Sequence, residues 1–133
     1  MPSATWTHHG ERACVVAFRD EMIGFAAAHG VPEPKLGDLK LAVSEAATNA
    51  VTHAFLGLAT PGRVTGTIDV DARAGRVTIV VSDDGIGLTP RPDSPGLGLG
   101  LPLIAAIAES IDLRAGAEGI GTELWMSFAF DAA

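Results

Sequence analysis

Apolar residues along the chain follow helical spacing in three segments. From Glu11 to about His29 they recur every three or four positions, which predicts an amphipathic helix that ends before Gly30. The pattern from Leu36 to about Phe55 is the strongest of the three, and its small residues would let the helix pack closely on a sheet. Pro32 and Pro34 are expected in the turn between these helices. A shorter helix is predicted from Leu101 to about Ser110.

Alternating or β-branched runs predict five strands between and around these helices. They cover about Ala4 to His8, Arg63 to Asp71, Arg76 to Ser82, Ile111 to Ala117 and Thr122 to Phe130. The run from Arg76 to Ser82 is mostly apolar, so we expect it in the centre of the sheet. The order of elements lacks regular βαβ units and predicts an α+β sandwich: one mixed or antiparallel sheet with about three helices on one face.

Composition indicates one compact domain over residues 1–133, since 47% of the 133 residues are hydrophobic. No apolar run approaches the roughly 20 residues that a membrane span needs, and the first residues do not resemble a signal peptide. Cys14, the only cysteine, lies in an apolar stretch and is expected to be a buried hydrophobe. These features favour the cytosol. The net charge of -7 and scattered basic residues argue against direct binding of nucleic acid.

The first candidate motif lies in the strongest helix. Glu45 and Asn49 are four residues apart and therefore project from the same side of that helix, and His53 continues the stripe. A carboxylate and an amide on an otherwise apolar face suit a metal-assisted site. The alternative is that the pair lies on the solvent edge of the helix and that His53 is a hydrogen-bonded structural histidine.

The second motif follows the central strand. Asp83 sits at the strand end, where a carboxylate can accept a hydrogen bond from an exocyclic amine such as that of adenine. Gly85 and Gly87 would let the backbone approach a flat base. An ordinary Asp-Gly turn explains the same residues, and the pattern alone does not decide between the two.

The third motif precedes the last helix. Gly96, Gly98 and Gly100 can expose backbone amides to phosphates next to the helix start at Leu101. The run is neither a dinucleotide-binding fingerprint nor a Walker loop, because it lacks a parallel βαβ unit and a following Lys-Ser or Lys-Thr. Without such a lysine, Mg²⁺ must neutralise more of the phosphate charge, and the amide oxygen of Asn49 is the natural protein ligand.

The order and spacing of these motifs resemble the GHKL superfamily of ATPases and kinases. The segment Leu41–Phe55 resembles its N box, Asp83–Leu88 its first glycine box, Gly96–Ile104 its second, and Gly121-Thr122 its late Gly-Thr. Within the superfamily the sequence is most similar to the bacterial anti-sigma-factor serine kinases, in the single small domain and the S-E-A-x-T-N-A-V-x-H-A segment. The resemblance implies a Bergerat-type two-layer sandwich that binds ATP and Mg²⁺.

The resemblance also implies a role for each matching residue. Glu45 would be the general base or orient the attacking hydroxyl, Asn49 would hold Mg²⁺, and Asp83 would bind the adenine amine. The remaining nucleotide contacts would come from His53, Gly85, Gly87, Gly96, Gly98, Gly100, Leu101 and Thr122, with Thr122 near the phosphates. Only seven residues, 89–95, form the lid, which is short for the family. Arg91 is its sole cation and either reaches the γ-phosphate or is solvated.

The function implied is a regulatory kinase. It would bind a sigma factor and phosphorylate a serine on an anti-anti-sigma antagonist of the STAS type, and the resemblance leaves a homodimer open. Two alternatives remain. The short lid suits a non-catalytic ATP-dependent binding module, and the shared superfamily suits the catalytic domain of a split histidine kinase.

Overall fold

The computed structural model describes residues 1–55, 62–85, 101–116 and 120–131. Its helices and strands, in chain order, are β1 (Ser3–His9), α1 (Ala13–Ala28), α2 (Glu33–Asn49), the π-helix η1 (Ala50–Ala54), β2 (Arg63–Asp71), β3 (Arg76–Asp83), α3 (Leu101–Ile107), β4 (Ser110–Ala115) and β5 (Thr122–Ala129).

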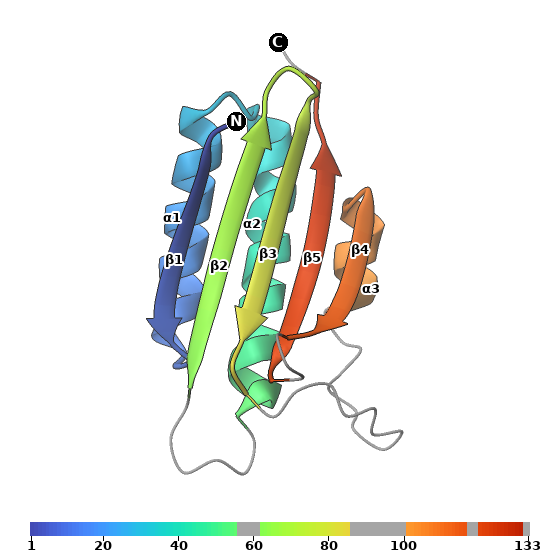
Figure 1. Cartoon of the computed structure of the whole chain (residues 1–133). Coiled ribbons are helices and arrows are strands. Elements are labelled where there is room, and N and C mark those ends of the chain that lie inside the picture. Colours follow the sequence, from blue (N-terminus) through green and yellow to red (C-terminus); the bar gives the residue numbers. More distant parts are fainter. Residues whose placement is uncertain (56–61, 86–100, 117–119, 132–133) are drawn as a thin grey trace.

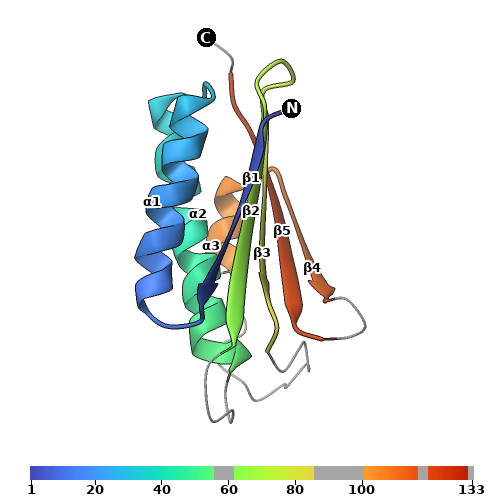
Figure 2. The same ribbon diagram turned by 60° about the vertical axis from the view of Figure 1, so that its left-hand side comes forward.

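The five strands form one sheet in the order β1-β2-β3-β5-β4, and every neighbouring pair is antiparallel. Helices α1, α2 and α3 all lie on the same face of this sheet (Figures 1 and 2). The opposite face carries no helix from the described part of the chain (Figure 2). The predicted α+β architecture is confirmed, and of the two sheet types left open by the sequence the antiparallel one is observed.

Strands β2 and β3 show why the sheet has one buried face. Beyond their exposed first residues, buried and partly exposed positions alternate along both strands as far as Ser82 in β3, as a strand period of two requires. The buried positions are Val64, Gly66, Ile68 and Val70 in β2 and Val77, Ile79 and Val81 in β3. At Gly66 a Cβ would lie only 2.9 Å from the ring of Phe18, so the absent side chain leaves room for α1 to pack. The central position of β3 is confirmed.

Helix α1 packs on the sheet through one residue per turn. Cys14, Phe18, Met22 and Ala26 are buried along a single stripe. Cys14 is 3% exposed, which confirms that it is a small buried hydrophobe. Burial, with the nearby charge of Glu11, raises the pKa of the Cys14 thiol, so the less reactive protonated form is favoured.

Helix α2 starts earlier than its apolar pattern indicates. Pro34 was expected in the preceding turn, but it lies in the first turn of α2, which begins at Glu33. That prediction is wrong because amides in the first turn have no partner within a helix, so proline fits there as well as in a turn. At its other end α2 continues without a break into η1, where the α-helical ladder widens into a π-turn before Phe55.

The C-terminal elements differ from the prediction in their bounds. Helix α3 ends at Ile107, and Ser110, expected as the last helical residue, is instead the first residue of β4. Ser110 pairs with Ser127 of β5, and their hydroxyl oxygens lie 2.6 Å apart. Ser110 could belong to a helix end or to a strand, and its pairing with β5 places it in the strand. A local sequence pattern does not reveal such pairing.

The apolar side chains buried between the helices and the sheet form one core cluster. It includes residues of all three α-helices and of β2, β3 and β5, with Phe18 and Phe128 as its largest fully buried side chains. Among the described residues, no helix is both long enough and apolar enough to cross a membrane.

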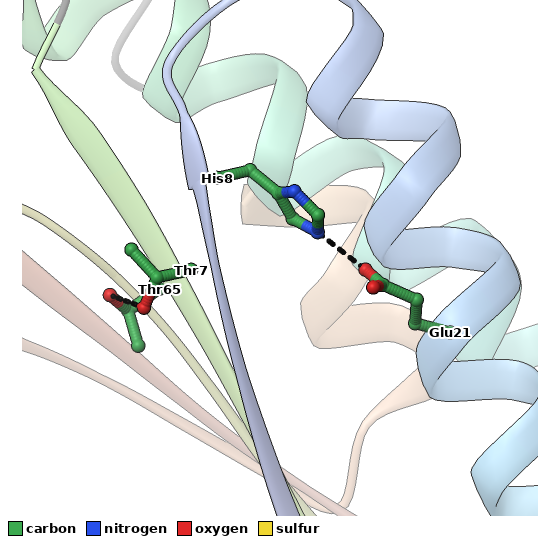
Figure 3. Close-up of polar contacts among 4 residues, drawn as sticks. All are labelled: Thr7, His8, Glu21 and Thr65. Carbon is green, nitrogen blue, oxygen red and sulfur yellow. Dashed lines mark hydrogen bonds and ion pairs between the residues drawn. The ribbon is translucent and has the colours of Figure 1, made fainter.

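The edge strand β1 is tied to its neighbours by polar side chains on both faces (Figure 3). On the helix face, Nε2 of His8 lies 2.6 Å from Oε1 of Glu21 in α1, and the imidazole packs edge-on against Phe18. On the open face, the hydroxyl oxygens of Thr7 and Thr65 are 3.1 Å apart. These contacts hold an edge strand that pairs with β2 alone.

Candidate functional site

Residues from two of the sequence motifs meet at one corner of the molecule. The end of the α2–η1 helix lies beside the end of β3 in both views (Figures 1 and 2). Gly85, just beyond β3, packs directly against the carbonyl oxygen of Ala54 in η1. Thr122, the first residue of β5, is the ladder partner of Asp83, the last residue of β3. The corner therefore brings together segments that are far apart in the sequence.

Asp83 presents a partly buried carboxylate at this corner. Its Oδ1 accepts a hydrogen bond of 3.0 Å from the backbone N–H of Gly85. Burial is the main influence on the Asp83 carboxyl and raises its pKa; the charge of Asp84 acts in the same direction, while hydrogen bonds from the Gly85 and Thr122 backbones act in the opposite one. A desolvated carboxylate held by two backbone amides is a pre-oriented acceptor for a ligand N–H.

Two glycines let the backbone close around Asp83. A side chain at Gly85 would overlap the carbonyl oxygen of Ala54, and one at Gly121 would overlap the carbonyl oxygen of Asp83. Gly121 also has a φ of 74°, a conformation that favours glycine. The sequence indicated that Gly85 allows close approach to a flat base. The contact that the structure defines is with Ala54.

Helix α2 carries the candidate catalytic and metal-binding residues. Glu45 and Asn49 are both partly buried, whereas the intervening Thr48 is exposed. Their spacing within α2 places them on one side of the helix, as expected. The expected continuation of this stripe to His53 stays a prediction, because His53 lies beyond α2, in the π-turn. His53 is partly buried there.

Several predicted contacts lie outside the described residues. These are Gly87, Arg91, Gly96, Gly98 and Gly100. Leu101 is described: it is the first residue of α3, partly buried and packed against the core. The pairing of Thr122 with Asp83 puts Thr122 next to the carboxylate expected to bind the base, and its proximity to the phosphates stays a prediction.

A magnesium ion bound to a nucleotide would need few ligands from this protein. The described residues contain no cluster of three or more His, Cys, Asp or Glu side chains that could hold a metal ion. Mg²⁺ commonly uses one or two protein ligands together with phosphate oxygens and water. The partly buried amide of Asn49 fits the part of such a ligand, and the chemistry that Mg²⁺ would supply is charge neutralisation on the phosphates.

Sequence reasoning missed Asp84 and the mutual contacts of this corner. Asp84 Oδ1 accepts a hydrogen bond of 2.7 Å from the backbone N–H of Arg63, which anchors the turn to β2. The repeated aspartate before Gly85 was a usable signal, because Asp often bonds to nearby backbone at turns. The contact between Gly85 and Ala54 had no local signal, since it depends on how α2 packs.

The sequence also matches known proteins. The histidine kinase-like ATPase domain family matches residues 10–128. The chain is 32% identical to an anti-sigma F factor from Clostridium acetobutylicum, over 72% of this chain and 71% of that protein. It is 27% identical to an anti-sigma F factor from Clostridium beijerinckii, over 73% of each.

The fold matches a solved structure. The crystal structure of the RsbU and RsbW domains of a Mycobacterium tuberculosis protein superimposes with a TM-score of 0.74 at 19% identity, and the match covers 97% of this chain. The chain spans about a third of that longer protein, 32%. With the family match over most of the sequence, these findings establish that the chain belongs to the histidine kinase-like ATPase domain family of the GHKL superfamily, close to the anti-sigma factors.

Proposed function

We propose that this protein is an anti-sigma regulatory factor that binds Mg-ATP and phosphorylates a serine of an antagonist. The antagonist would be an anti-anti-sigma protein of the STAS type, and the second partner a sigma factor that the protein sequesters in the cytosol. A homodimer stays open. Membership of an ATPase family and similarity to two anti-sigma F factors support this function.

One observation carries the proposal: the segment with the N-box residues and the segment with Asp83 pack against each other. Gly85 contacts the backbone of Ala54, five residues beyond Asn49 in the same continuous helix. A site for ATP needs an acceptor for the base at one end and a magnesium ligand towards the phosphates. Asp83 and Asn49 have suitable side chains for these two ends. Both are partly buried, and Asn49 ends α2, which continues into η1.

The transfer step requires little from the protein beyond position and charge. The serine hydroxyl of the antagonist gives its proton to the Glu45 carboxylate as its oxygen bonds to the γ-phosphorus. The bond between that phosphorus and the oxygen bridging to the β-phosphate breaks, and ADP leaves with the negative charge. Glu45 is partly buried one helical turn before Asn49, so its carboxylate lies on the side of the helix that bears the proposed metal ligand.

The test is transfer of labelled phosphate from Mg-ATP to candidate STAS proteins, followed by identification of the labelled residue. The wild type should label a serine. Glu45→Gln should slow transfer by about 10²- to 10⁴-fold and leave ATP affinity unchanged. Glu33→Gln, at an exposed position in the first turn of the same helix, is the matched control and should transfer normally.

Each other outcome contradicts the proposed kinase. Label on a histidine of a partner would identify a split histidine kinase. Tight ATP binding without transfer to any STAS protein would identify a non-catalytic binding module, the alternative that the sequence of residues 89–95 suggested.

A further inference from the structure

The turn after β3 is tied to the first residue of β2 by two hydrogen bonds, and both involve Asp84. The N–H of Asp84 donates to the carbonyl of Arg63 over 3.3 Å, and Asp84 Oδ1 accepts from the N–H of Arg63 over 2.7 Å. In a regular antiparallel pair the second bond would run to the backbone carbonyl of Asp84. Here the side chain replaces that carbonyl, so pairing extends one residue past Val64 and Asp83 while the backbone begins to turn.

The Asp84 carboxylate is held in place by packing as well as by hydrogen bonding. A side chain at Gly62 would overlap Asp84 Oδ1, so the carboxylate lies directly on the Gly62 backbone. The carbonyl of Gly62 in turn accepts a hydrogen bond of 2.8 Å from the N–H of Gly10, just after β1. Although Asp84 is exposed, its carboxylate is held against the start of β2, and that segment is bonded in turn to the residue after β1.

Asp84 stands between the two residues that shape the proposed base site. Asp83 precedes it, and Gly85, which follows, donates to Asp83 Oδ1 and packs on Ala54. Any shift of Asp84 therefore moves the acceptor carboxylate and the glycine together. Asp84 also acts through its charge, which raises the pKa of the Asp83 carboxyl in addition to the larger effect of burial.

We propose that Asp84 is a positioning residue for adenine recognition: its bond to the Arg63 amide fixes the turn that aims the Asp83 carboxylate at the base. This role rests on the proposed function, because it assumes that Asp83 binds adenine. In this role Asp84 itself touches neither the base nor the phosphates, and it acts only through Asp83 and Gly85.

Two substitutions separate the hydrogen bond from the charge. Asp84→Asn keeps an oxygen of the same shape and loses the charge, whereas Asp84→Ala loses both. Asp71→Ala is the matched control: Asp71 Oδ1 accepts a hydrogen bond of 3.1 Å from the Ala74 N–H in the turn at the opposite end of the same hairpin. We would measure Mg-ATP affinity by calorimetry, and backbone amide exchange in the nucleotide-free protein.

Asp84→Ala should weaken ATP binding by about threefold to tenfold, the worth of one hydrogen bond, and speed exchange of the Arg63 amide. Asp84→Asn should restore both values to within about twofold of the wild type at neutral pH. Asp71→Ala should leave ATP affinity unchanged. Because Asp84→Asn removes a charge that raises the pKa of Asp83, ATP binding by this variant should persist to lower pH than in the wild type.

The outcomes distinguish this inference from the proposed function. Wild-type affinity in Asp84→Ala, with faster exchange of the Arg63 amide, would overturn the positioning role and leave the proposed function intact. Equal losses in Asp84→Asn and Asp84→Ala would also overturn it, because the charge alone would then be responsible. A wild type that binds no Mg-ATP would overturn the proposed function, and the positioning role with it.

Discussion

Gly85 lies so close to the carbonyl oxygen of Ala54 that no residue with a side chain fits at that position. This contact joins the turn after β3 to the π-turn at the end of the N-box helix. The contact explains why a glycine follows Asp83 and Asp84: the backbone of Ala54 leaves no room for a side chain. No unusual dihedral angle is needed to account for it. The approach of these two segments is also what the proposed ATP site depends on.

Gly85→Ala should therefore damage both stability and binding. The new methyl group meets backbone rather than a flexible side chain, so we expect a loss of about 1–3 kcal/mol in the free energy of unfolding and weaker ATP binding. Gly24→Ala is the control, because Gly24 is exposed within α1 and a Cβ at this position would have no neighbouring atom within 4 Å. That change should stabilise the protein by about 0.5–1 kcal/mol. Chemical denaturation and calorimetry measure both effects, and a harmless Gly85→Ala would contradict the close contact.

Asp83→Asn should abolish ATP binding and stabilise the nucleotide-free protein at neutral pH. Burial raises the pKa of the Asp83 carboxyl in the folded state above its ordinary value of 3.8. The folded state therefore holds the proton more tightly than the unfolded state, and the stability that the protonated group contributes is lost as pH rises from 3.8 through the folded-state pKa. Asparagine at position 83 does not ionise, so the variant keeps this stability at neutral pH. Thermal unfolding across pH tests the prediction, and a destabilised Asp83→Asn at neutral pH would count against it.

Asn49→Ala should remove the magnesium dependence of ATP binding. If the Asn49 amide is the protein ligand of Mg²⁺, the variant should bind ATP equally with Mg²⁺ and with a chelator, whereas the wild type should prefer Mg²⁺. Thr48→Ala changes the exposed neighbouring residue and should behave like the wild type. Titration calorimetry in both buffers gives the comparison. If Asn49→Ala still binds ATP more tightly with Mg²⁺ than with a chelator, Asn49 is not the magnesium ligand.

Glu21→Ala should loosen the edge strand without affecting the nucleotide. It removes the partner of His8, and both side chains are 30% exposed, so we expect a loss of about 0.5–1.5 kcal/mol in unfolding free energy. Asp20→Ala is the control, because Asp20 is 72% exposed and lies 3.8 Å from Arg19; its effect should stay within about 0.5 kcal/mol. A double-mutant cycle with His8→Ala isolates the pair. A coupling energy of zero would show that the contact adds nothing to stability.

Much of the fold follows from local patterns. The alternation in β2 and the spacing in α1 are strong because one face of each element is buried, so the predicted strands and helices were confirmed. The errors occurred where two local structures suit the same residues. Pro34 fits a turn or a first helical turn, and Ser110 fits a helix end or an edge strand, and packing decides between them. The π-turn at Ala50–Ala54 has no simple pattern in the sequence.

The candidate site was predictable only where its residues are neighbours along the chain. Asp83 and Gly85 could be singled out as candidates because the carboxylate and the glycine belong to one short turn. The pairing of Asp83 with Thr122 depends on strand register, and the contact of Gly85 with Ala54 depends on how a helix packs, so neither is encoded at a fixed spacing. The hydrogen bond between Asp84 and Arg63 could not be predicted either, because it also depends on which strands pair.

The central claim is that this corner of the molecule recognises adenine, and parallel calorimetric titrations with Mg-ATP and Mg-GTP test it most directly. Adenine offers Asp83 an amine donor, whereas guanine presents a carbonyl oxygen at the same ring position. A carboxylate facing that oxygen leaves two acceptors opposed, so ATP should bind at least about a hundredfold more tightly than GTP. Equal affinity for the two nucleotides, or no binding of ATP, would contradict the assignment of Asp83.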